Sequence, residues 1–368
     1  MRRWVAYATA ALAAGLVAAL AALGACGGPG PAPVPPPPPP SAVTRTPTAP
    51  PTVRACATDA LLVPACGVLW GASAGGFTAV PRDRALKAWE GRTGRTATIF
   101  HTYHRGDDLF PTRSEIAMTR DPARPRVLLV NWRVDDGVTW AQVARGAVDE
   151  RIDRWARHVR RTYRQRFFLV VRHEPEADVD PRPGSGMTAR DFALMYRHVI
   201  ERVRADGVDN AITVLAYMGS EKWQARPWWS GLYPGDDVVD WIGLDSYVSA
   251  EPGRYHFGGF ADLLDRRPDT GGSGFYDWAT TRHPGKPVMV AEWGVYHRVG
   301  RPADKAPEFA SVLPELRRRP AIKAIVYFDT DNDAYGDRDI SVDSSASSLA
   351  AFRRLATDPL FDVTVNDP

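Results

Sequence analysis

The sequence has few of the features that mark several common classes of protein. Only 3 of its 368 residues are cysteine and none forms a Cys-x-x-Cys pair, so a zinc ribbon or a disulfide-rich scaffold is not expected. Lys and Arg number 46 against 43 Asp and Glu, without a long basic run, so nucleic-acid binding is not expected. A phosphate loop with its lysine and a His-Glu-x-x-His motif are missing. We therefore predict a protein with no cofactor and no bound metal.

The first 25 residues predict an export signal. Two arginines precede an apolar, Ala-rich run, Trp4–Ala22, and Leu-Gly-Ala then leads into Cys26. This ending resembles a bacterial lipoprotein box, which predicts that Cys26 is lipidated and anchors the protein to the outer face of the bacterial cell membrane. The alternative is an ordinary signal peptide cut elsewhere. No later stretch is apolar enough to span a bilayer.

A linker and one folded domain are expected to follow. Residues 26–55 are dominated by proline and cannot bury a core, so they predict an extended spacer. Residues 56–368 then form the domain, which we expect to be a monomer. In an oxidising exterior Cys56 and Cys66, ten residues apart, are expected to form a disulfide; two free thiols are the alternative.

Short apolar runs alternate with amphipathic segments through this domain. The runs begin at Val68, Thr96, Arg126, Phe167, Ile212, Val238, Pro287 and Ala324. Their near-continuous apolarity is typical of parallel strands covered on both faces. Helical patterns cover residues 147–164, 188–206, 307–319 and 347–357, with Thr188 and Ser347 as candidate N-caps. Eight strands alternating with helices predict an α/β fold, a single (β/α)8 TIM barrel.

Two glutamates end strands that face each other across the predicted barrel. The fourth run ends at His173-Glu174 and the seventh at Glu292-Trp293, where active sites of such barrels lie. Alternation along the seventh run places Glu292 on the face of Val290, which we take as the inward face. A carboxyl pair is suited to glycosidic bond cleavage, which needs a proton donor and a negative charge near the anomeric carbon.

The motifs around these glutamates resemble glycoside hydrolase family 26, the β-mannanase family. They are VVRHEP at Val170, VDWIGLDSY at Val239, KPVMVAEWG at Lys286 and Asn131-Trp132. The resemblance implies a retaining enzyme that cleaves a β-linked polysaccharide, with β-1,4-mannan as the expected substrate. It assigns Glu174 as acid/base and Glu292 as nucleophile, with Tyr247 orienting Glu292. His173 and Asp245 are expected at the substrate, and Trp132 and Trp293 are expected to stack on sugar rings.

Two departures from the family pattern bear on the substrate. Pro-Glu-Ala-Asp follows Glu174 where the family commonly has an Asn-Gly-x-Trp type sequence, and the eighth run ends in Phe328-Asp329 rather than near a tryptophan. Another β-glucan, xylan or an exopolysaccharide therefore remains open, as does a polysaccharide-binding lipoprotein without turnover. The acidic stretch from Asp329 is expected to be a solvated loop, with a cation site as the alternative.

Overall fold

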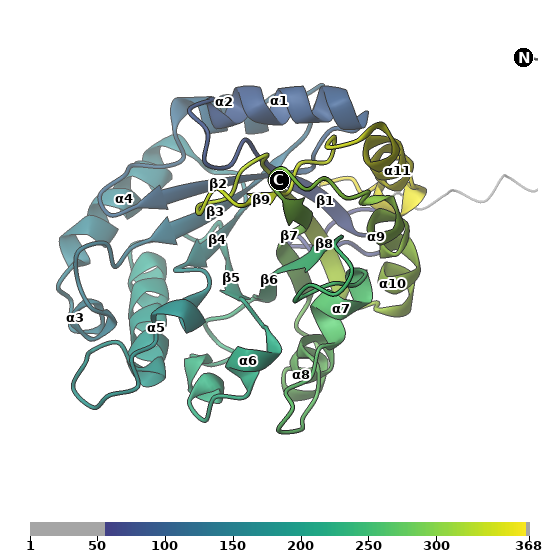
Figure 1. The fold of residues 1–368 in the computed structure, drawn as a ribbon. Helices are drawn as coiled ribbons and strands as arrows, with labels where there is room; N and C mark the ends of the chain where they lie inside the picture. The colour runs from purple at the N-terminus through teal and green to yellow at the C-terminus, as the bar shows by residue number, and fades with distance from the viewer. Residues whose placement is uncertain (1–55, 366–368) are drawn as a thin grey trace, which may run out of the picture. The chain divides into compact units, whose positions relative to one another are not determined.

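The computed structural model describes residues 56–365, and its centre is a closed barrel of parallel strands (Figure 1). The strands are β1 (Leu69–Ala74), β2 (Ile99–Arg105), β3 (Val127–Arg133), β4 (Phe167–Val171), β5 (Ala211–Tyr217), β6 (Trp241–Ser249), β7 (Val288–Arg298) and β8 (Ile322–Asp329). Each pairs in parallel with its sequence neighbours, and β1 pairs with β8 to close the ring. The predicted TIM barrel is confirmed, and every predicted strand is present.

The pairing of β7 with its two neighbours departs from regular register in three places. The register between β6 and β7 shifts between Leu244 and Asp245, and that between β7 and β8 shifts between Val288 and Met289 and again between Val290 and Trp293. A two-residue strand, β9 (Arg338–Asp339), pairs antiparallel with the end of β7. Such irregularities change the direction of side chains, and the shift between Val290 and Trp293 spans Glu292.

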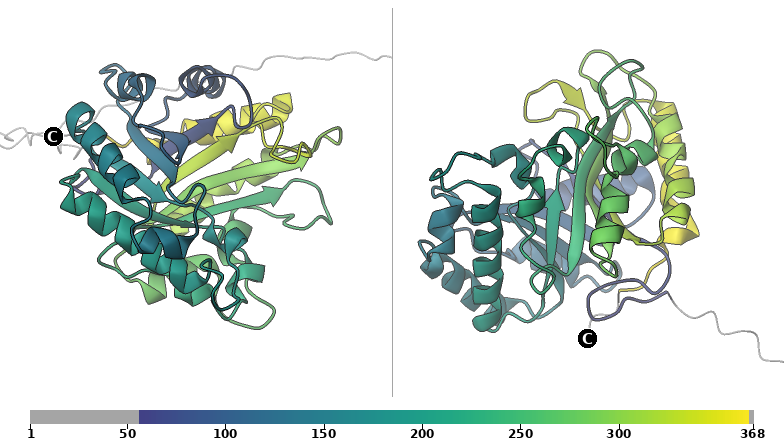
Figure 2. Two further views of the ribbon diagram at one scale, coloured as in Figure 1. Left: turned by 90° about the vertical axis from the view of Figure 1, so that its left-hand side faces the viewer. Right: turned by 90° about the horizontal axis from the view of Figure 1, so that it is seen from below.

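Helices surround the strands on the outside, as the turned views also show (Figure 2). They are α1 (Arg82–Thr93), α2 (Arg113–Thr119), α3 (Trp140–Ala144), α4 (Asp149–Thr162), α5 (Ala189–Ala205), α6 (Glu221–Gln224), α7 (Phe260–Asp265), α8 (Phe275–Arg282), α9 (Ala306–Ala310), α10 (Val312–Arg318) and α11 (Ala346–Ala356), with 3-10 turns η1 (Pro175–Asp178), η2 (Trp229–Leu232) and η3 (Pro359–Phe361).

The helix ends agree only partly with the sequence patterns. Thr188 caps α5 as predicted, because its side chain accepts a hydrogen bond from Asp191 N. The cap of α11 is Ser345, which accepts from Ser348 N, and not Ser347 as predicted. The pattern predicted as one helix over residues 307–319 is divided at Ser311 into α9 and α10.

Strand alternation produces two apolar cores. The smaller one fills the barrel with every second strand residue, such as Leu129, Val170, Met289 and Ala291. The larger one packs the other strand faces against the helices. Burial on both faces explains why the strands have near-continuous apolar sequences.

The segment before β1 covers the N-terminal end of the barrel. Leu62 is fully buried in the inner core, and Trp241 Nε1 donates to Leu61 O at 2.8 Å. The predicted bridge between Cys56 and Cys66 is present, with Cα atoms 5.3 Å apart. It ties this segment together at the end of the barrel opposite the carboxyl ends of the strands.

The predicted signal peptide, Cys26 and the proline-rich linker lie outside the described residues. Within residues 56–365, no helix combines the length and apolarity needed to cross a membrane.

Candidate active site

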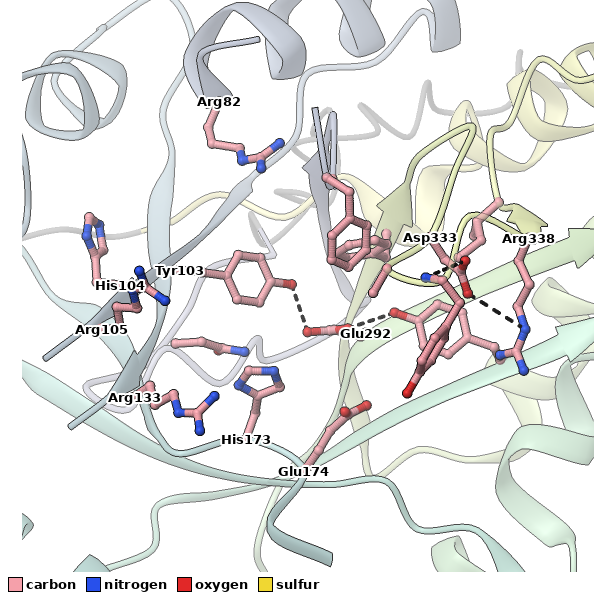
Figure 3. A pocket seen from close by; sticks show the side chains of 18 of the residues that line it. Arg82, Tyr103, His104, Arg105, Arg133, His173, Glu174, Glu292, Asp333 and Arg338 are labelled. Carbon is pink, nitrogen blue, oxygen red and sulfur yellow. Dashed lines mark hydrogen bonds and ion pairs between the residues drawn. The ribbon is translucent and has the colours of Figure 1, made fainter. Parts of the chain in front are cut away.

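A pocket of about 710 Å³ opens at the carboxyl ends of the strands and contains both predicted catalytic glutamates (Figure 3). Its wall is made of residues from the strand ends and the loops that follow them: Gly76, Phe77, Arg82, Tyr103, His104, Arg105, Asp108, Asn131, Arg133, His173, Glu174, Tyr247, Glu292, Tyr296, Phe328, Asp333, Ala334, Tyr335, Arg338 and Ile340. Of the predicted site residues, the structure brings Glu174, Glu292, His173 and Tyr247 together here.

Glu292 is held by two tyrosine hydroxyls. Tyr247 of β6 donates to Oε2 at 2.7 Å, and Tyr103 of β2 donates to Oε1 at 2.7 Å. The carboxylate is 6% exposed. Burial raises the pKa of Glu292, and the two hydrogen bonds lower it because they stabilise the ionised form. Each oxygen of Glu292 therefore has a fixed direction, as a nucleophile needs.

The bulge explains how Glu292 reaches the pocket. Its strand neighbours Val288 and Val290 belong to the outer core, whereas Met289 and Ala291 fill the barrel. Regular alternation would therefore turn Glu292 outward. The register shift between Val290 and Trp293 turns it inward instead. The predicted inward face of Val290 was wrong, although the predicted position of Glu292 was right.

Glu174 lies just beyond β4 in a left-handed backbone conformation, with φ 52° and ψ 47°. Arg172, two residues earlier, also has a positive φ of 55°. Such conformations cost about 1–3 kcal/mol each outside glycine and persist where surrounding contacts hold them. Glu174 N donates to Ala216 O at 3.0 Å, and the Arg172 guanidinium pairs with Asp178 and, at 3.6 Å, with Asp135. This strained backbone lowers the stability of the fold and directs the Glu174 side chain into the pocket.

Three carboxyl groups meet at the base of the site. One oxygen each of Glu174, Asp245 and Glu292 lie within 4.8 Å of one another. Asp245 is 2% exposed, no side chain donates to it, and it does not line the pocket. It therefore lies beside the two glutamates but off the pocket wall, so the predicted substrate contact of Asp245 is not supported.

Crowding and burial shift the acid strengths of this group. Burial, and then the charges of Glu292 and Glu176, raise the pKa of Glu174 well above its usual range. The pKa of Asp245 is also raised well above its usual range, by burial and by the charges of Glu292 and Glu174. The hydroxyls of Tyr103 and Tyr247 stabilise the ionised form of Glu292, and they donate to neither Glu174 nor Asp245. Burial raises the pKa of Glu292 overall as well, but among the three carboxyls only Glu292 accepts side-chain hydrogen bonds that stabilise its ionised form, whereas Glu174 and Asp245 are favoured in their protonated forms.

His173 lies on the pocket wall beside Glu174, with its ring 5.7 Å from that of Tyr103. Burial, and then the charges of Arg172 and Arg133, lower the pKa of His173 to about 4. It is therefore neutral near pH 7, with a ring nitrogen that can bind a hydroxyl without adding a charge.

The two predicted sugar-stacking tryptophans are core residues, and this prediction needs correction. Trp132 is 0% exposed, and its ring lies 4.9 Å from Trp155 while its Nε1 donates to Gly106 O at 3.1 Å. Trp293 is 1% exposed and packs edge-on against Tyr327 at 4.9 Å. Both belong to the outer core, because each points away from the barrel axis.

Apart from Tyr247 and His173, the aromatic side chains that face the pocket were not predicted. Tyr103 follows Ile99 and His101 on the inward face of β2, so strand alternation could have identified it. By the same reasoning Asn131, not Trp132, is the inward residue at the end of β3. Phe77 and Tyr335 lie in loops and are 59% and 89% exposed, and no sequence pattern marks them.

The acidic stretch after β8 is used for internal contacts. Asp329 is buried, pairs with Arg92 at 3.0 Å and accepts a hydrogen bond from Val342 N. Asp333 Oδ1 accepts hydrogen bonds from Tyr335 N and Asp337 N. Among residues 56–365, the only cluster of three or more acidic, histidine or cysteine side chains close enough together to hold a cation consists of Glu174, Asp245 and Glu292.

Comparison with solved structures identifies proteins that share this fold. No model of a known protein family matches the chain. A modular endo-β-1,4-mannanase from Cellulomonas fimi, of glycoside hydrolase family 26, superimposes with a TM-score of 0.54 over 81% of this chain and 72% of its own, at 19% identity. A family 26 β-mannanase from Bacteroides ovatus gives 0.51 over 82% and 90%, at 15% identity. The chain shares the fold of these mannanases.

Similarity in sequence is confined to a short stretch. Over 70 residues the chain is 36% identical to a β-1,3-xylanase from a Vibrio species and 33% identical to one from an Alcaligenes species. That stretch is 18% of this chain and 14% of the length of each xylanase.

Proposed function

We propose that the protein is a retaining β-glycoside hydrolase that cleaves a β-linked polysaccharide. The observation that carries this proposal is the pairing of two unlike glutamates. Glu292 accepts hydrogen bonds from Tyr103 and Tyr247 that stabilise its ionised form, while Glu174, within 4.8 Å, has the raised pKa of a proton donor. Membership of glycoside hydrolase family 26 is part of the proposal, supported by the fold and by the motifs at β4, β6 and β7.

In the first half of the reaction Glu174 gives its proton to the glycosidic oxygen as that bond breaks. Glu292 attacks the anomeric carbon from the other side and forms a covalent glycosyl-enzyme. Both hydrogen bonds to Glu292 orient the attacking oxygen. Neutral His173 lies where it can bind a hydroxyl of the sugar.

In the second half a water molecule replaces the departed sugar. Glu174, now ionised, takes a proton from this water while the water oxygen attacks the anomeric carbon, and Glu292 leaves with the electrons of its bond. Two inversions give net retention. Retaining enzymes hold their carboxyl groups about 5–5.5 Å apart, and inverting enzymes need about 6.5–9.5 Å. Oxygens within 4.8 Å favour the first arrangement.

β-1,4-Mannan is the first substrate to test, because the structural neighbours are named mannanases. β-1,3-Xylan is the second, on the strength of the short stretch shared with two xylanases. A polysaccharide-binding protein without turnover is the rival, and the complete set of Glu174, Glu292, Tyr103 and Tyr247 favours catalysis over it. Export and anchoring through Cys26 belong to the same proposal.

Reducing-sugar release from a polysaccharide panel tests the proposal. The panel holds mannan, galactomannan, mixed-linkage glucan, β-1,4- and β-1,3-xylan and an acidic exopolysaccharide, each with wild type and with Glu174→Gln. Activity on one polymer that the variant loses supports a hydrolase and identifies its substrate. Tight binding to a polymer without release from any of them would overturn it in favour of the binding protein.

A further inference from the structure

One flank of the pocket carries three arginines that have few acidic partners in the described part of the protein. Arg82 comes from the first turn of α1, Arg105 from the end of β2 and Arg133 from the end of β3. Figure 3 shows all three on the Tyr103 side of Glu292, with Asp333 and Arg338 on the other side. The flank thus presents a positive surface to the space beside the glutamates.

Neighbouring acids leave these charges largely unpaired. Within residues 56–365, no carboxylate forms an ion pair with Arg82 or Arg105, and Arg133 has only Asp136, at 4.0 Å. Arg82 donates instead to the backbone oxygens of Gly75 and Ala74, which fixes its side chain but leaves its charge uncompensated.

Two acids near this flank, Asp108 and Glu115, have other partners. Asp108 accepts from Arg105 N at 3.0 Å and lies 3.7 Å from His104, whose Nε2 lies 2.8 Å from Glu115. Across the pocket, in contrast, Arg338 lies 3.9 Å from Asp333 and stacks over Tyr296. The unpaired positive charge on the pocket wall is therefore confined to the side that carries Arg82, Arg105 and Arg133, which we call the β1–β3 flank.

Other groups account for the main pKa shifts of the catalytic carboxyls. The charge of Arg172, which lies outside the pocket wall, lowers the pKa of Glu174, and the pKa of Glu292 responds to burial and to the hydroxyls of Tyr247 and Tyr103. A neutral sugar has hydroxyl groups, which need no cation. Guanidinium groups bind carboxylates and other oxyanions through paired, charge-assisted hydrogen bonds.

We propose that the substrate is an acidic polysaccharide, and that Arg82, Arg105 and Arg133 bind an anionic group of the sugar held on the β1–β3 flank. A carboxylate, as in a uronic acid, and a sulfate ester share the chemistry that this flank recognises. The proposal rests on the proposed hydrolase function and specifies its substrate class.

A matched set of polymers separates charge from backbone. β-1,4-Mannan is compared with the same mannan oxidised at C6 to carboxylate, with that polymer after carboxyl reduction, and with sulfated mannan. We expect kcat/KM to be at least about tenfold higher on a charged polymer, and to return to the neutral value on carboxyl reduction. The two charged polymers distinguish a carboxylate from a sulfate.

Arginine variants locate the effect. In Arg105→Gln and in Arg133→Gln we expect KM on the charged polymer to rise about tenfold. KM on neutral mannan should rise less, and kcat should change little on either polymer. Arg84→Gln is the control, because Arg84 lies on α1 beside Arg82 but is exposed and off the pocket wall. Added salt is expected to raise KM on the charged polymer only.

The outcomes separate this proposal from the function on which it rests. The acidic substrate would be overturned if neutral mannan were hydrolysed faster than either charged polymer. It would also be overturned if the arginine variants raised KM equally on neutral and charged polymers. Neither result would contradict the proposed hydrolase function. If no polymer is cleaved, affinity is measured by calorimetry. Charge-dependent binding that Arg133→Gln weakens would then support the anionic ligand alone, and charge-independent binding or none would overturn it.

Discussion

The hydroxyl of Tyr103 lies 2.7 Å from Oε1 of Glu292 and fixes the carboxylate oxygen that Tyr247 leaves open. Because this bond favours the ionised form, its loss in Tyr103→Phe should raise the pKa of Glu292 further. A nucleophile must be ionised, so the acidic limb of the kcat/KM profile should move to higher pH, and kcat/KM should fall by about 10- to 100-fold.

Tyr233→Phe is the matched control for that variant. Tyr233 also donates to a carboxylate, Asp236, but that carboxylate is at the surface and away from the pocket. Its pH profile should coincide with that of wild type. An unchanged acidic limb in Tyr103→Phe would show that Tyr103 does not act on the ionisation of Glu292.

Removal of each glutamate should leave a different chemical trace. Glu292→Ala should lose turnover on an activated aryl β-glycoside, and azide should restore it by entering the vacated space to give the α-glycosyl azide. Glu174→Ala should keep the first step on the same activated substrate, whose leaving group needs no proton, and azide should yield the β-glycosyl azide. Product stereochemistry is read by NMR, and exchanged anomers would reverse the two roles.

Arg172 is expected to support both stability and catalysis. Replacing this buried guanidinium in Arg172→Met leaves Asp135 without its ion-pair partner, although Trp140 Nε1 still donates to it, and this should cost about 3–5 kcal/mol in the free energy of unfolding. The left-handed backbone at Glu174 should relax, so kcat should also fall. Arg182→Met, which breaks an exposed pair with Asp180, should leave stability nearly unchanged, because solvent screens such pairs. Denaturant melts that are equal for the two variants would contradict this account.

The disulfide should affect stability without affecting catalysis. Closing a loop of ten residues stabilises a chain by about 2–3 kcal/mol. The double variant Cys56→Ser, Cys66→Ser should lose about this much in chemical denaturation and keep the kcat of wild type, because the bridge lies at the opposite end of the barrel. A large fall in kcat at a temperature where the variant is fully folded would be inconsistent with this placement.

The barrel could be predicted from the sequence because strands buried on both faces leave an unbroken apolar pattern. Glu174 and Glu292 were identified because the carboxyl ends of parallel strands meet at one end of the barrel. The side-chain directions beside them were harder to predict. The indole ring of Trp132 suggested stacking on a sugar, although alternation from Leu129 places Asn131 inward.

At β7 alternation itself gives the wrong answer, because the bulge that turns Glu292 inward depends on pairing with β6 and β8. The positive φ at Glu174 likewise depends on contacts from distant residues, including Ala216 and Asp135. The fold alone brings Phe77, Tyr335 and the three arginines of the β1–β3 flank together around the pocket. Sequence motifs therefore located the carboxyl pair, whereas the walls that select a substrate required the structure.

The configuration of the first sugar released tests the central claim most directly. Hydrolysis of an activated aryl β-glycoside, or of the polymer cleaved in the panel, is followed by proton NMR before the anomers equilibrate. A carboxyl pair with oxygens within 4.8 Å predicts the β-anomer first, through a glycosyl-enzyme on Glu292. Initial release of the α-anomer would contradict the account, because it would require a water molecule between the glutamates in place of the attack by Glu292.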